Sequence, residues 1–150
     1  MTEVHAMNKY DSLKLENQLC FPLYAASKEI VRRYKPALDK LDLTYTQYIT
    51  MMVMWEHEEV SVKEIGELLY LDSGTLTPVL KTLEKKGYIK RTRSKEDERE
   101  LVVKTTAAGE NLKDDALAVP KSMTACVKLD PKEAKTLYSI LYKLLGKQQQ

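Results

Sequence analysis

The chain has 150 residues, of which 43% are hydrophobic and 31% are charged, and its formal net charge is +2. This length suits one domain with a core of its own, and this balance excludes an intrinsically disordered protein. No apolar run approaches the roughly 18 residues that cross a bilayer, and residues 1–10 lack a signal-peptide core, so we expect a cytoplasmic protein without a membrane partner.

The first predicted helix spans about residues 11–41. Pro22 and Pro36 interrupt the pattern, and we expect a kink or break near each. Apolar residues recur through this segment at the spacing of one helical face: Leu15, Leu19, Leu23, Ile30, Val31, Tyr34, Leu38 and Leu41.

Three shorter helices are predicted next. Residues 44–47 (Thr-Tyr-Thr-Gln) and 61–64 (Ser-Val-Lys-Glu) have the form of capping boxes, and each indicates a helix start. Asp72 and Ser73 can cap a fourth helix, which Gly87 ends. Pro78 fits that helix only if its regular part begins late, near Thr75.

The pattern then changes to strands. Residues 88–93 and 100–105 are short and partly alternating, and the charged residues 94–99 separate them, which predicts a β-hairpin with a polar tip. Helix resumes near Ala107, with a bend expected at Pro120. The residues 130–133 (Asp-Pro-Lys-Glu) then start a last helix to about Leu145.

This order of elements predicts a winged helix-turn-helix: a mainly α fold with a small β-hairpin wing. We expect a single domain over residues 1–150, with the winged helix-turn-helix at about 44–105. The flanking helices, at about 11–41 and 107–147, have apolar faces that one small domain cannot cover, so we expect a homodimer whose twofold symmetry matches a palindromic DNA operator. A helix fits the major groove, and a hairpin can reach the adjacent minor groove.

Basic residues are concentrated on this part of the chain. A local excess of positive charge in a nearly neutral chain indicates a phosphate-binding surface, although a solvated charged face would have the same composition. The cluster consists of Lys81, Lys85, Lys86, Lys90, Arg91, Arg93, Lys95, Arg99 and Lys104.

Several stretches resemble a known family. Residues 15–21 (Leu-Glu-Asn-Gln-Leu-Cys-Phe), 34–36, 43–45, 71–78 (Leu-Asp-Ser-Gly-Thr-Leu-Thr-Pro) and 95–99 are similar to the MarR family of transcription regulators. The resemblance covers nearly the whole chain. It is greatest to the OhrR-type repressors, which sense organic hydroperoxides through a thiol, and it implies six helices and a wing.

The resemblance also implies which residues bind double-stranded DNA. Ser73, Thr75 and Thr77 would lie at the groove-facing start of the recognition helix, where hydroxyls can bond base edges or phosphates, although simple helix capping is the alternative. Lys81 would lie farther along that helix. In the wing, Arg91 and Arg93 would contribute positive charge, Asp97 would brace the arginines, and Arg99 would enter the minor groove.

Cys20 is the sensing residue that the resemblance implies. We expect it about two turns into the first helix, too far from the helix start for the dipole to stabilise a thiolate. Tyrosine hydroxyls would do so instead: Tyr34 and Tyr45 from the partner subunit, with Tyr24 one turn after the cysteine. An apolar pocket for the peroxide could be lined by Phe21, Met51, Met52, Met54 and Trp55, although methionines at this spacing are more often core.

Cys126 is the second thiol. In the two-cysteine form of these sensors it would resolve oxidised Cys20 by an intersubunit disulfide; in the one-cysteine form a small thiol caps Cys20 instead. The predicted function is a repressor that releases DNA when an organic hydroperoxide oxidises Cys20.

Other classes of function remain open at this stage. A MarR-type regulator gated by a small phenolic ligand and a broader thiol-based global regulator are the alternatives. Residues 120–126 (Pro-Lys-Ser-Met-Thr-Ala-Cys) approximate a peroxiredoxin-like loop, but its spacing is short by one residue and no strand–helix alternation surrounds it, so an enzyme is not expected. The histidines and cysteines show no metal-ligand spacing, and no cofactor is expected.

Overall fold

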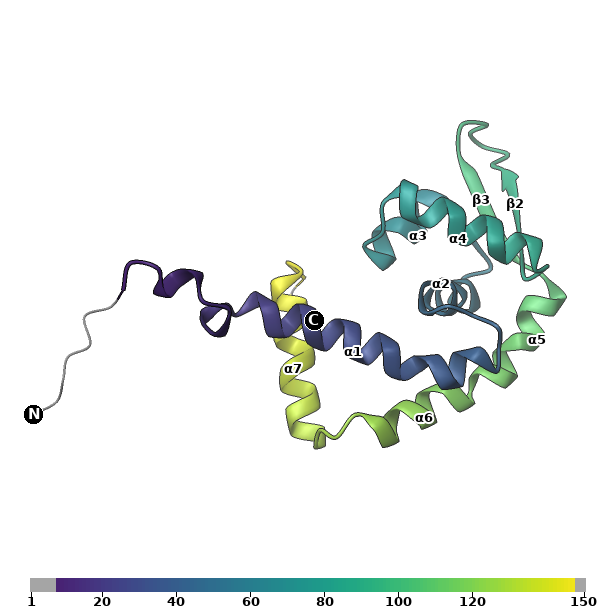
Figure 1. Cartoon of the computed structure of the whole chain (residues 1–150). Coiled ribbons are helices and arrows are strands. Elements are labelled where there is room, and N and C mark those ends of the chain that lie inside the picture. The colour runs from purple at the N-terminus through teal and green to yellow at the C-terminus, as the bar shows by residue number, and fades with distance from the viewer. Residues whose placement is uncertain (1–7, 148–150) are drawn as a thin grey trace, which may run out of the picture.

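A computed structural model describes residues 8–147 (Figure 1). Most of residues 1–10, in which no signal peptide is expected, lie outside this range. The fold is mainly helical with one small antiparallel sheet, as predicted. Helix α2 lies at the centre, and the arm that η1 and η2 form projects away from the other elements. The elements are η1 (Asp11–Leu13), η2 (Leu15–Asn17), α1 (Cys20–Asp39), α2 (Tyr45–Glu56), β1 (Glu59–Ser61), α3 (Val62–Leu69), α4 (Ser73–Lys85), β2 (Ile89–Arg93), β3 (Leu101–Thr105), α5 (Ala107–Ala116), α6 (Ala118–Cys126) and α7 (Pro131–Leu144).

The first helix begins later than predicted. Two 3-10 turns replace its expected first turns, and α1 starts at Cys20. The side chain of Asn17 donates to the carbonyl of Asp11 (2.7 Å), and that of Gln18 donates to the carbonyl of Ser12 (2.7 Å). Such local side-chain bonds compete with helix formation. Neither proline breaks α1, because Pro22 lies in its first turn, where no intrahelical acceptor is lost, and Pro36 lies one turn from its end.

The helix-turn-helix consists of α3, a tight turn and α4. Ser61 caps α3 by accepting from the amide of Glu64, and Tyr70 ends α3 in the left-handed region (φ 55°). Gly66 permits the turn, because a Cβ at this position would lie 2.8 Å from the carbonyl oxygen of Leu71. The two helices are thereby held in close contact at the turn.

Helix α4 begins at Ser73 and not near Thr75, so the prediction for Pro78 is wrong. Asp72 caps the helix at this earlier point by accepting from the amide of Thr75 at 2.8 Å. Pro78 is therefore the sixth helical residue, and the carbonyl of Gly74 has no amide donor there. Burial of one face of α4 stabilises the helix despite this loss, through Leu76, Leu80 and Leu83, each at most 1% exposed.

The predicted hairpin forms as β2 and β3, with Ile89 opposite Thr105 and Arg93 opposite Leu101. A third strand, β1, pairs with β3 and gives the order β1-β3-β2; the sequence analysis did not predict it. It has only three residues, and a single one of them, Val60, is buried. So short a segment has too little alternation to identify as a strand.

The last three helices frame one side of the molecule (Figure 1). The predicted fifth helix breaks at Leu117 instead of bending at Pro120, so the described residues contain seven α-helices where the resemblance implies six. Helix α7 begins at the predicted capping box, in which Asp130 and Glu133 bond each other's backbone amides. None of the residues of α7, all within the described range, is buried. Among residues 8–147, no helix is long and apolar enough to cross a membrane.

Candidate nucleic-acid interface and thiol site

The start of α4 presents the hydroxyl side chains named by the sequence analysis. Ser73 and Thr75 are exposed, Thr77 is partly buried, and Lys81 is exposed on the next turn. Ser73, Thr77 and Lys81 follow one another at intervals of four residues and therefore share one helical face. This face lies about a quarter turn around the helix from the buried leucines, which is why Thr77 is partly buried while Ser73 and Lys81 are exposed.

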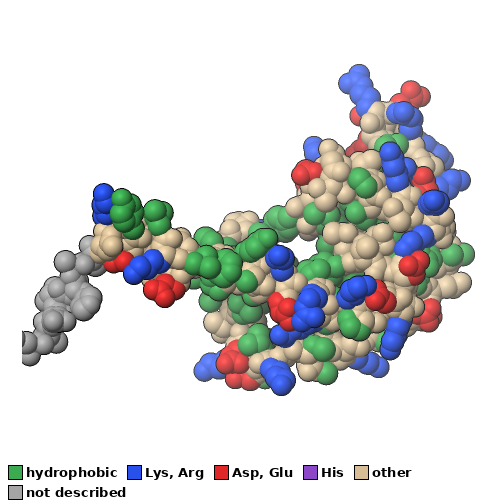
Figure 2. Space-filling view, viewed as in Figure 1, with side chains coloured by type: hydrophobic (Ala, Val, Ile, Leu, Met, Phe, Trp, Pro, Cys, Tyr) green, Lys and Arg blue, Asp and Glu red, His purple; other side chains and the backbone are tan. Residues whose placement is uncertain are grey.

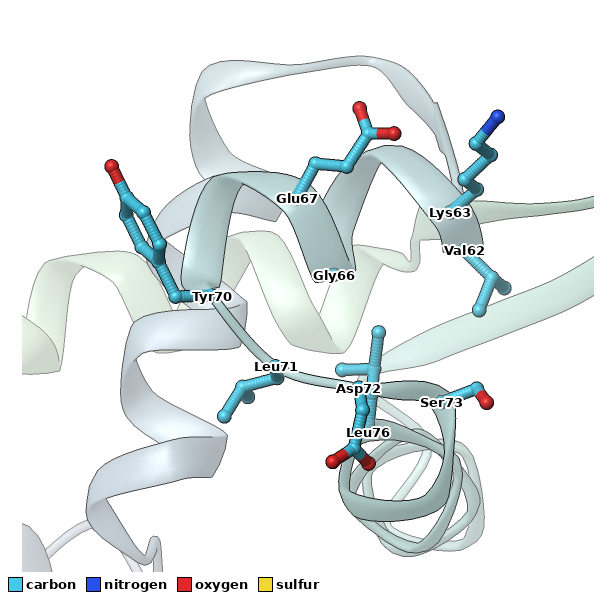
Figure 3. Close-up of a pocket in the computed structure, with 9 residues that line it drawn as sticks. All are labelled: Val62, Lys63, Gly66, Glu67, Tyr70, Leu71, Asp72, Ser73 and Leu76. Atoms are coloured by element: carbon cyan, nitrogen blue, oxygen red, sulfur yellow. The ribbon is translucent and has the colours of Figure 1, made fainter. Parts of the chain in front are cut away.

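A hollow separates α3 from α4 beside this face (Figure 3). Val62 and Leu76 point into it, whereas Lys63 and Glu67 point outward along its rim. The hollow follows the turn between the helices, where Gly66 makes its close approach to Leu71.

The wing is tied to α4 by an ion pair that the sequence analysis missed. The carboxylate of Glu84 accepts from the backbone amide of Arg91 (2.9 Å) and from its guanidinium (3.2 Å). These bonds lower the pKa of Glu84 below its ordinary value. The side chain of Arg91 is only 19% exposed, so its charge holds β2 against α4. No periodicity relates residues 84 and 91, because the chain reverses direction between them.

The tip of the wing is stabilised by its own backbone. Arg93 donates to the carbonyl of Glu98 (2.8 Å), and the side chain of Asp97 accepts from the backbone amide of Arg99 (3.0 Å). Asp97 thus braces the turn and not an arginine guanidinium. Within residues 8–147 the guanidinium of Arg99 makes no ion pair or hydrogen bond, and it is exposed at the tip. Lys and Arg side chains gather on the wing and along the neighbouring edge in Figure 2.

Cys20 occupies a different position from the one expected. It is exposed and is the first residue of α1, directly after the arm. Backbone amides of the first helical turn lack intrahelical acceptors and favour negative charge nearby. The expectation that Cys20 lies about two turns into the first helix is therefore wrong. Tyr24 lies one turn later and is 60% exposed, with the Nζ atom of Lys28 5.2 Å from its ring.

Tyr34 and Tyr45 pack together at the far end of α1. Their ring centroids are 4.9 Å apart, and Tyr48, which the sequence analysis did not name, lies 6.0 Å from Tyr34. Burial raises the pKa of all three hydroxyls, so each stays protonated and can donate a hydrogen bond at neutral pH. Tyr34 is almost four helical turns beyond Cys20, about 20 Å along the axis. Tyr34 of the same chain therefore cannot reach the Cys20 sulfur.

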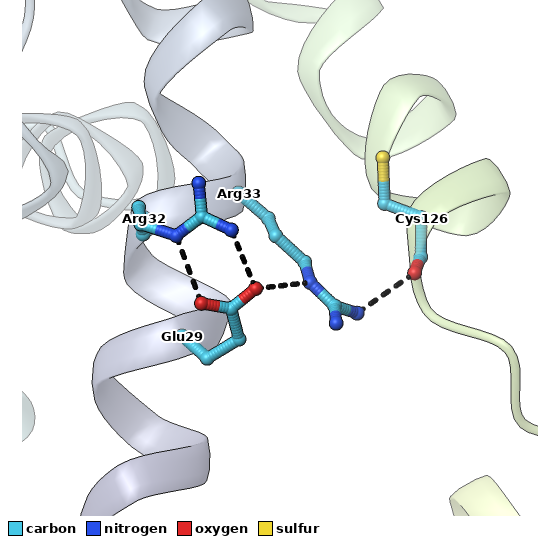
Figure 4. Close-up of polar contacts among 4 residues, drawn as sticks. All are labelled: Glu29, Arg32, Arg33 and Cys126. Carbon is cyan, nitrogen blue, oxygen red and sulfur yellow. Dashed lines mark hydrogen bonds and ion pairs between the residues drawn. The ribbon is translucent and has the colours of Figure 1, made fainter.

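Cys126 is exposed at the end of α6. Its carbonyl oxygen accepts a hydrogen bond from Nη1 of Arg33 at 3.0 Å (Figure 4). Arg33 is more than three turns beyond Cys20 on α1, about 20 Å along the axis. Since disulfides need Cα atoms within about 7 Å, the two cysteines of one chain cannot pair in this conformation.

The apolar residues named for a peroxide pocket do not come together. Met51 and Met54 are core residues, 0% and 1% exposed, which is the alternative that their helical spacing had left open. Met52 is exposed on the other face of α2, and the indole of Trp55 donates to the carbonyl of Gly109. Phe21 lies beside Cys20 on α1, with 42% of its surface exposed. Of this set, only Phe21 neighbours Cys20.

Comparison with known proteins identifies close relatives. The family model for the transcriptional regulator SarA/Rot matches residues 32–116. The organic hydroperoxide resistance transcriptional regulator of Bacillus subtilis is 51% identical over 138 residues, 92% of this chain and 94% of that protein. The HTH-type transcriptional regulator SarZ of Staphylococcus haemolyticus is 50% identical over 105 residues, 70% of this chain and 71% of that protein.

Solved structures with the same fold point to the same kind of protein. AbfR of Staphylococcus epidermidis, in its reduced form bound to DNA, superposes with a TM-score of 0.74 at 34% identity, over 92% of this chain and 96% of that one. These relatives are transcription regulators and not enzymes, which confirms the resemblance, the winged helix-turn-helix and the expected class of protein. The chain belongs to the MarR/SarA family of winged helix-turn-helix transcriptional regulators.

Proposed function

We propose that this chain is a dimeric repressor that binds a palindromic operator when reduced and releases it when an organic hydroperoxide oxidises Cys20. The 51% identity to a regulator of organic hydroperoxide resistance supports this function. The observation that carries the proposal is the position of Cys20, exposed and first in α1. A thiol there is accessible to a peroxide.

The chemistry needs one thiolate and one peroxide. The sulfur of Cys20 attacks the terminal oxygen of the hydroperoxide, the O–O bond breaks, and the alkoxide takes a proton from water to leave as an alcohol. Cys20 becomes a sulfenic acid. The protonated hydroxyls of Tyr34 and Tyr45 of the partner subunit would donate to the thiolate before the attack, and Tyr24 would complete the set of donors.

DNA binding would use α4 and the wing. Ser73, Thr75 and Thr77 would contact base edges or phosphates at the helix start, Lys81 would contact the backbone, and Arg93 and Arg99 would extend the contact into the minor groove. Arg91 and Asp97 would act indirectly, by holding the wing in place.

A dimer would present two such surfaces. Apolar side chains on α7 and on the arm stay exposed in the single chain, and a second copy would bury them. The exposed set includes Leu13, Leu15, Leu19, Leu137, Tyr138, Ile140 and Leu144, with exposed fractions from 44% to 85%.

Structures of AbfR suggest which oxidised form releases DNA. Structures exist of AbfR reduced and bound to DNA, overoxidised and bound to DNA, and with a disulfide formed. The present chain superposes on the disulfide form with a TM-score of 0.62, against 0.74 for both DNA-bound forms. A disulfide between Cys20 and the partner's Cys126, rather than oxidation alone, is therefore the releasing event in this proposal.

The test combines thiol chemistry with DNA release. One equivalent of cumene hydroperoxide per subunit should form a sulfenic acid on Cys20, which dimedone traps and mass spectrometry locates in a parallel sample. Without dimedone, operator DNA should be released with the time course of covalent dimer formation. Cys126→Ser should form the sulfenic acid but no covalent dimer, and should keep its DNA. Release by salicylate but not by peroxide would contradict the proposal and favour a ligand-gated regulator.

A further inference from the structure

Among the described residues, one long-range side-chain hydrogen bond joins the end of α6 to α1. Nη1 of Arg33 donates to the carbonyl oxygen of Cys126 at 3.0 Å, across 93 residues of sequence. This carbonyl belongs to the last turn of a helix, where carbonyls have no intrahelical donor. An arginine at that place satisfies the carbonyl and favours the negative end of the helix dipole.

Arg33 is itself fixed by Glu29 on the preceding turn of α1 (Figure 4). Its Nε atom lies 3.2 Å from the Glu29 carboxylate, which also accepts two hydrogen bonds from Arg32, at 2.7 and 2.8 Å. Bonds from these two arginines lower the pKa of Glu29 to about 2, so the carboxylate stays charged at physiological pH. Arg32 shares the carboxylate but has no contact with Cys126 among the described residues.

The contact restrains more than one residue. The amide of Val127 bonds the carbonyl of Met123 (2.9 Å), and three residues later Asp130 caps α7. The junction between α6 and α7 is therefore short. Holding the carbonyl of Cys126 against α1 fixes this junction and the backbone that carries the Cys126 thiol.

We propose that Arg33 is a positioning residue that holds Cys126 against α1 and so slows its disulfide formation with oxidised Cys20, the second step of sensing. This inference rests on the proposed function, because it concerns the thiol that resolves the sulfenic acid. In that step the Cys126 sulfur attacks the sulfur of the partner's Cys20 sulfenic acid, the S–O bond breaks, and the hydroxyl leaves as water with the thiol proton. In this proposal the Cys126 backbone leaves α1 for the attack, and Arg33 opposes that movement.

The test compares Arg33→Met with Arg32→Met. Both variants remove one cation and one partner of Glu29, but only the first removes the bond to Cys126. After one equivalent of cumene hydroperoxide, the loss of the Cys20 thiol is followed by mass spectrometry, and the covalent dimer by quenching with N-ethylmaleimide and non-reducing electrophoresis. Arg33→Met should form the covalent dimer about tenfold faster, as expected for loss of one charge-assisted hydrogen bond. The loss of the Cys20 thiol should keep its wild-type rate.

Arg33→Lys should restore much of the wild-type delay, because an ammonium can still donate to the carbonyl. Circular dichroism and sedimentation of the reduced variants show whether they are folded dimers, and the pair Arg33→Ala and Arg32→Ala replaces the methionine variants if these are not. Equal rates of covalent dimer formation in Arg33→Met and Arg32→Met, or a slower rate in Arg33→Met, would overturn the inference. If the wild type oxidises Cys20 but forms no covalent dimer, the inference is lost while Cys20 remains the sensor. An unreactive Cys20 contradicts the proposed function itself.

Discussion

Two arginines of the wing, Arg91 and Arg99, should respond differently to salt. Arg99 is exposed at the wing tip and its guanidinium makes no contact within residues 8–147, whereas the guanidinium of Arg91 is paired with Glu84. An unpaired arginine can neutralise a DNA phosphate and release a counterion. A paired arginine brings no net charge to the interface. Arg99→Ala should therefore change the salt dependence of DNA binding, and a neutral replacement of the pair should not.

The expected size of this change follows from counterion release. Each phosphate neutralised contributes about 0.9 to the slope of log K against log salt, so one Arg99 in each subunit contributes about 1.8. Between about 50 and 200 mM salt, the affinity advantage of the wild type over Arg99→Ala should shrink roughly tenfold. The loss of affinity should be largest on operators with A·T-rich flanks, where the minor groove is narrow.

Fluorescence anisotropy with a labelled operator at four salt concentrations measures the slope. The matched control is the double variant Glu84→Gln with Arg91→Gln, which removes the pair without changing the net charge. It should lose affinity through a looser wing while keeping the wild-type slope. A wild-type slope in Arg99→Ala would refute the assignment of Arg99 as a DNA contact.

Three further outcomes are expected. Leu144→Asp, on the exposed face of α7, should give a monomer or unfolded chain in sedimentation and lose DNA binding; a fully dimeric variant would contradict the interface. Glu84→Gln should lower the melting temperature at pH 7. Because Arg91 lowers the pKa of Glu84, the stabilisation is present above the unfolded value near 4.5 and is lost as pH falls below it, so the difference in melting temperature should vanish in acid. Tyr45→Phe should bind DNA normally and slow the oxidation of Cys20 in stopped-flow measurements, and an unchanged rate would remove Tyr45 from the thiol site.

Local signals in the sequence predicted most of the element starts. The capping boxes at Thr44 and Asp130 appear in the structure with both reciprocal bonds, because such contacts involve neighbouring residues only. The predicted start of the first helix was wrong, also because of contacts between neighbouring residues. Leu15 and Leu19 continue the helical spacing, but the side chains of Asn17 and Gln18 bond earlier carbonyls and end the pattern.

The site was predictable in its residue types but not in its contacts. Glu84 with Arg91, and Arg33 with the carbonyl of Cys126, meet only after the chain has folded back on itself. Neither pair has a spacing that a helix or strand would impose. The position of Cys20 at a helix start likewise depended on where the arm ends, which the apolar periodicity concealed.

The most direct test of the central claim is an operator titration of wild type and Cys20→Ser, each with and without one equivalent of cumene hydroperoxide. Both proteins should bind equally when reduced. After peroxide the wild type should lose affinity about a thousandfold, equivalent to about 4 kcal/mol, and Cys20→Ser should be unchanged. Release of DNA by peroxide-treated Cys20→Ser would contradict the claim that Cys20 is the sensor and leave only the DNA-binding function.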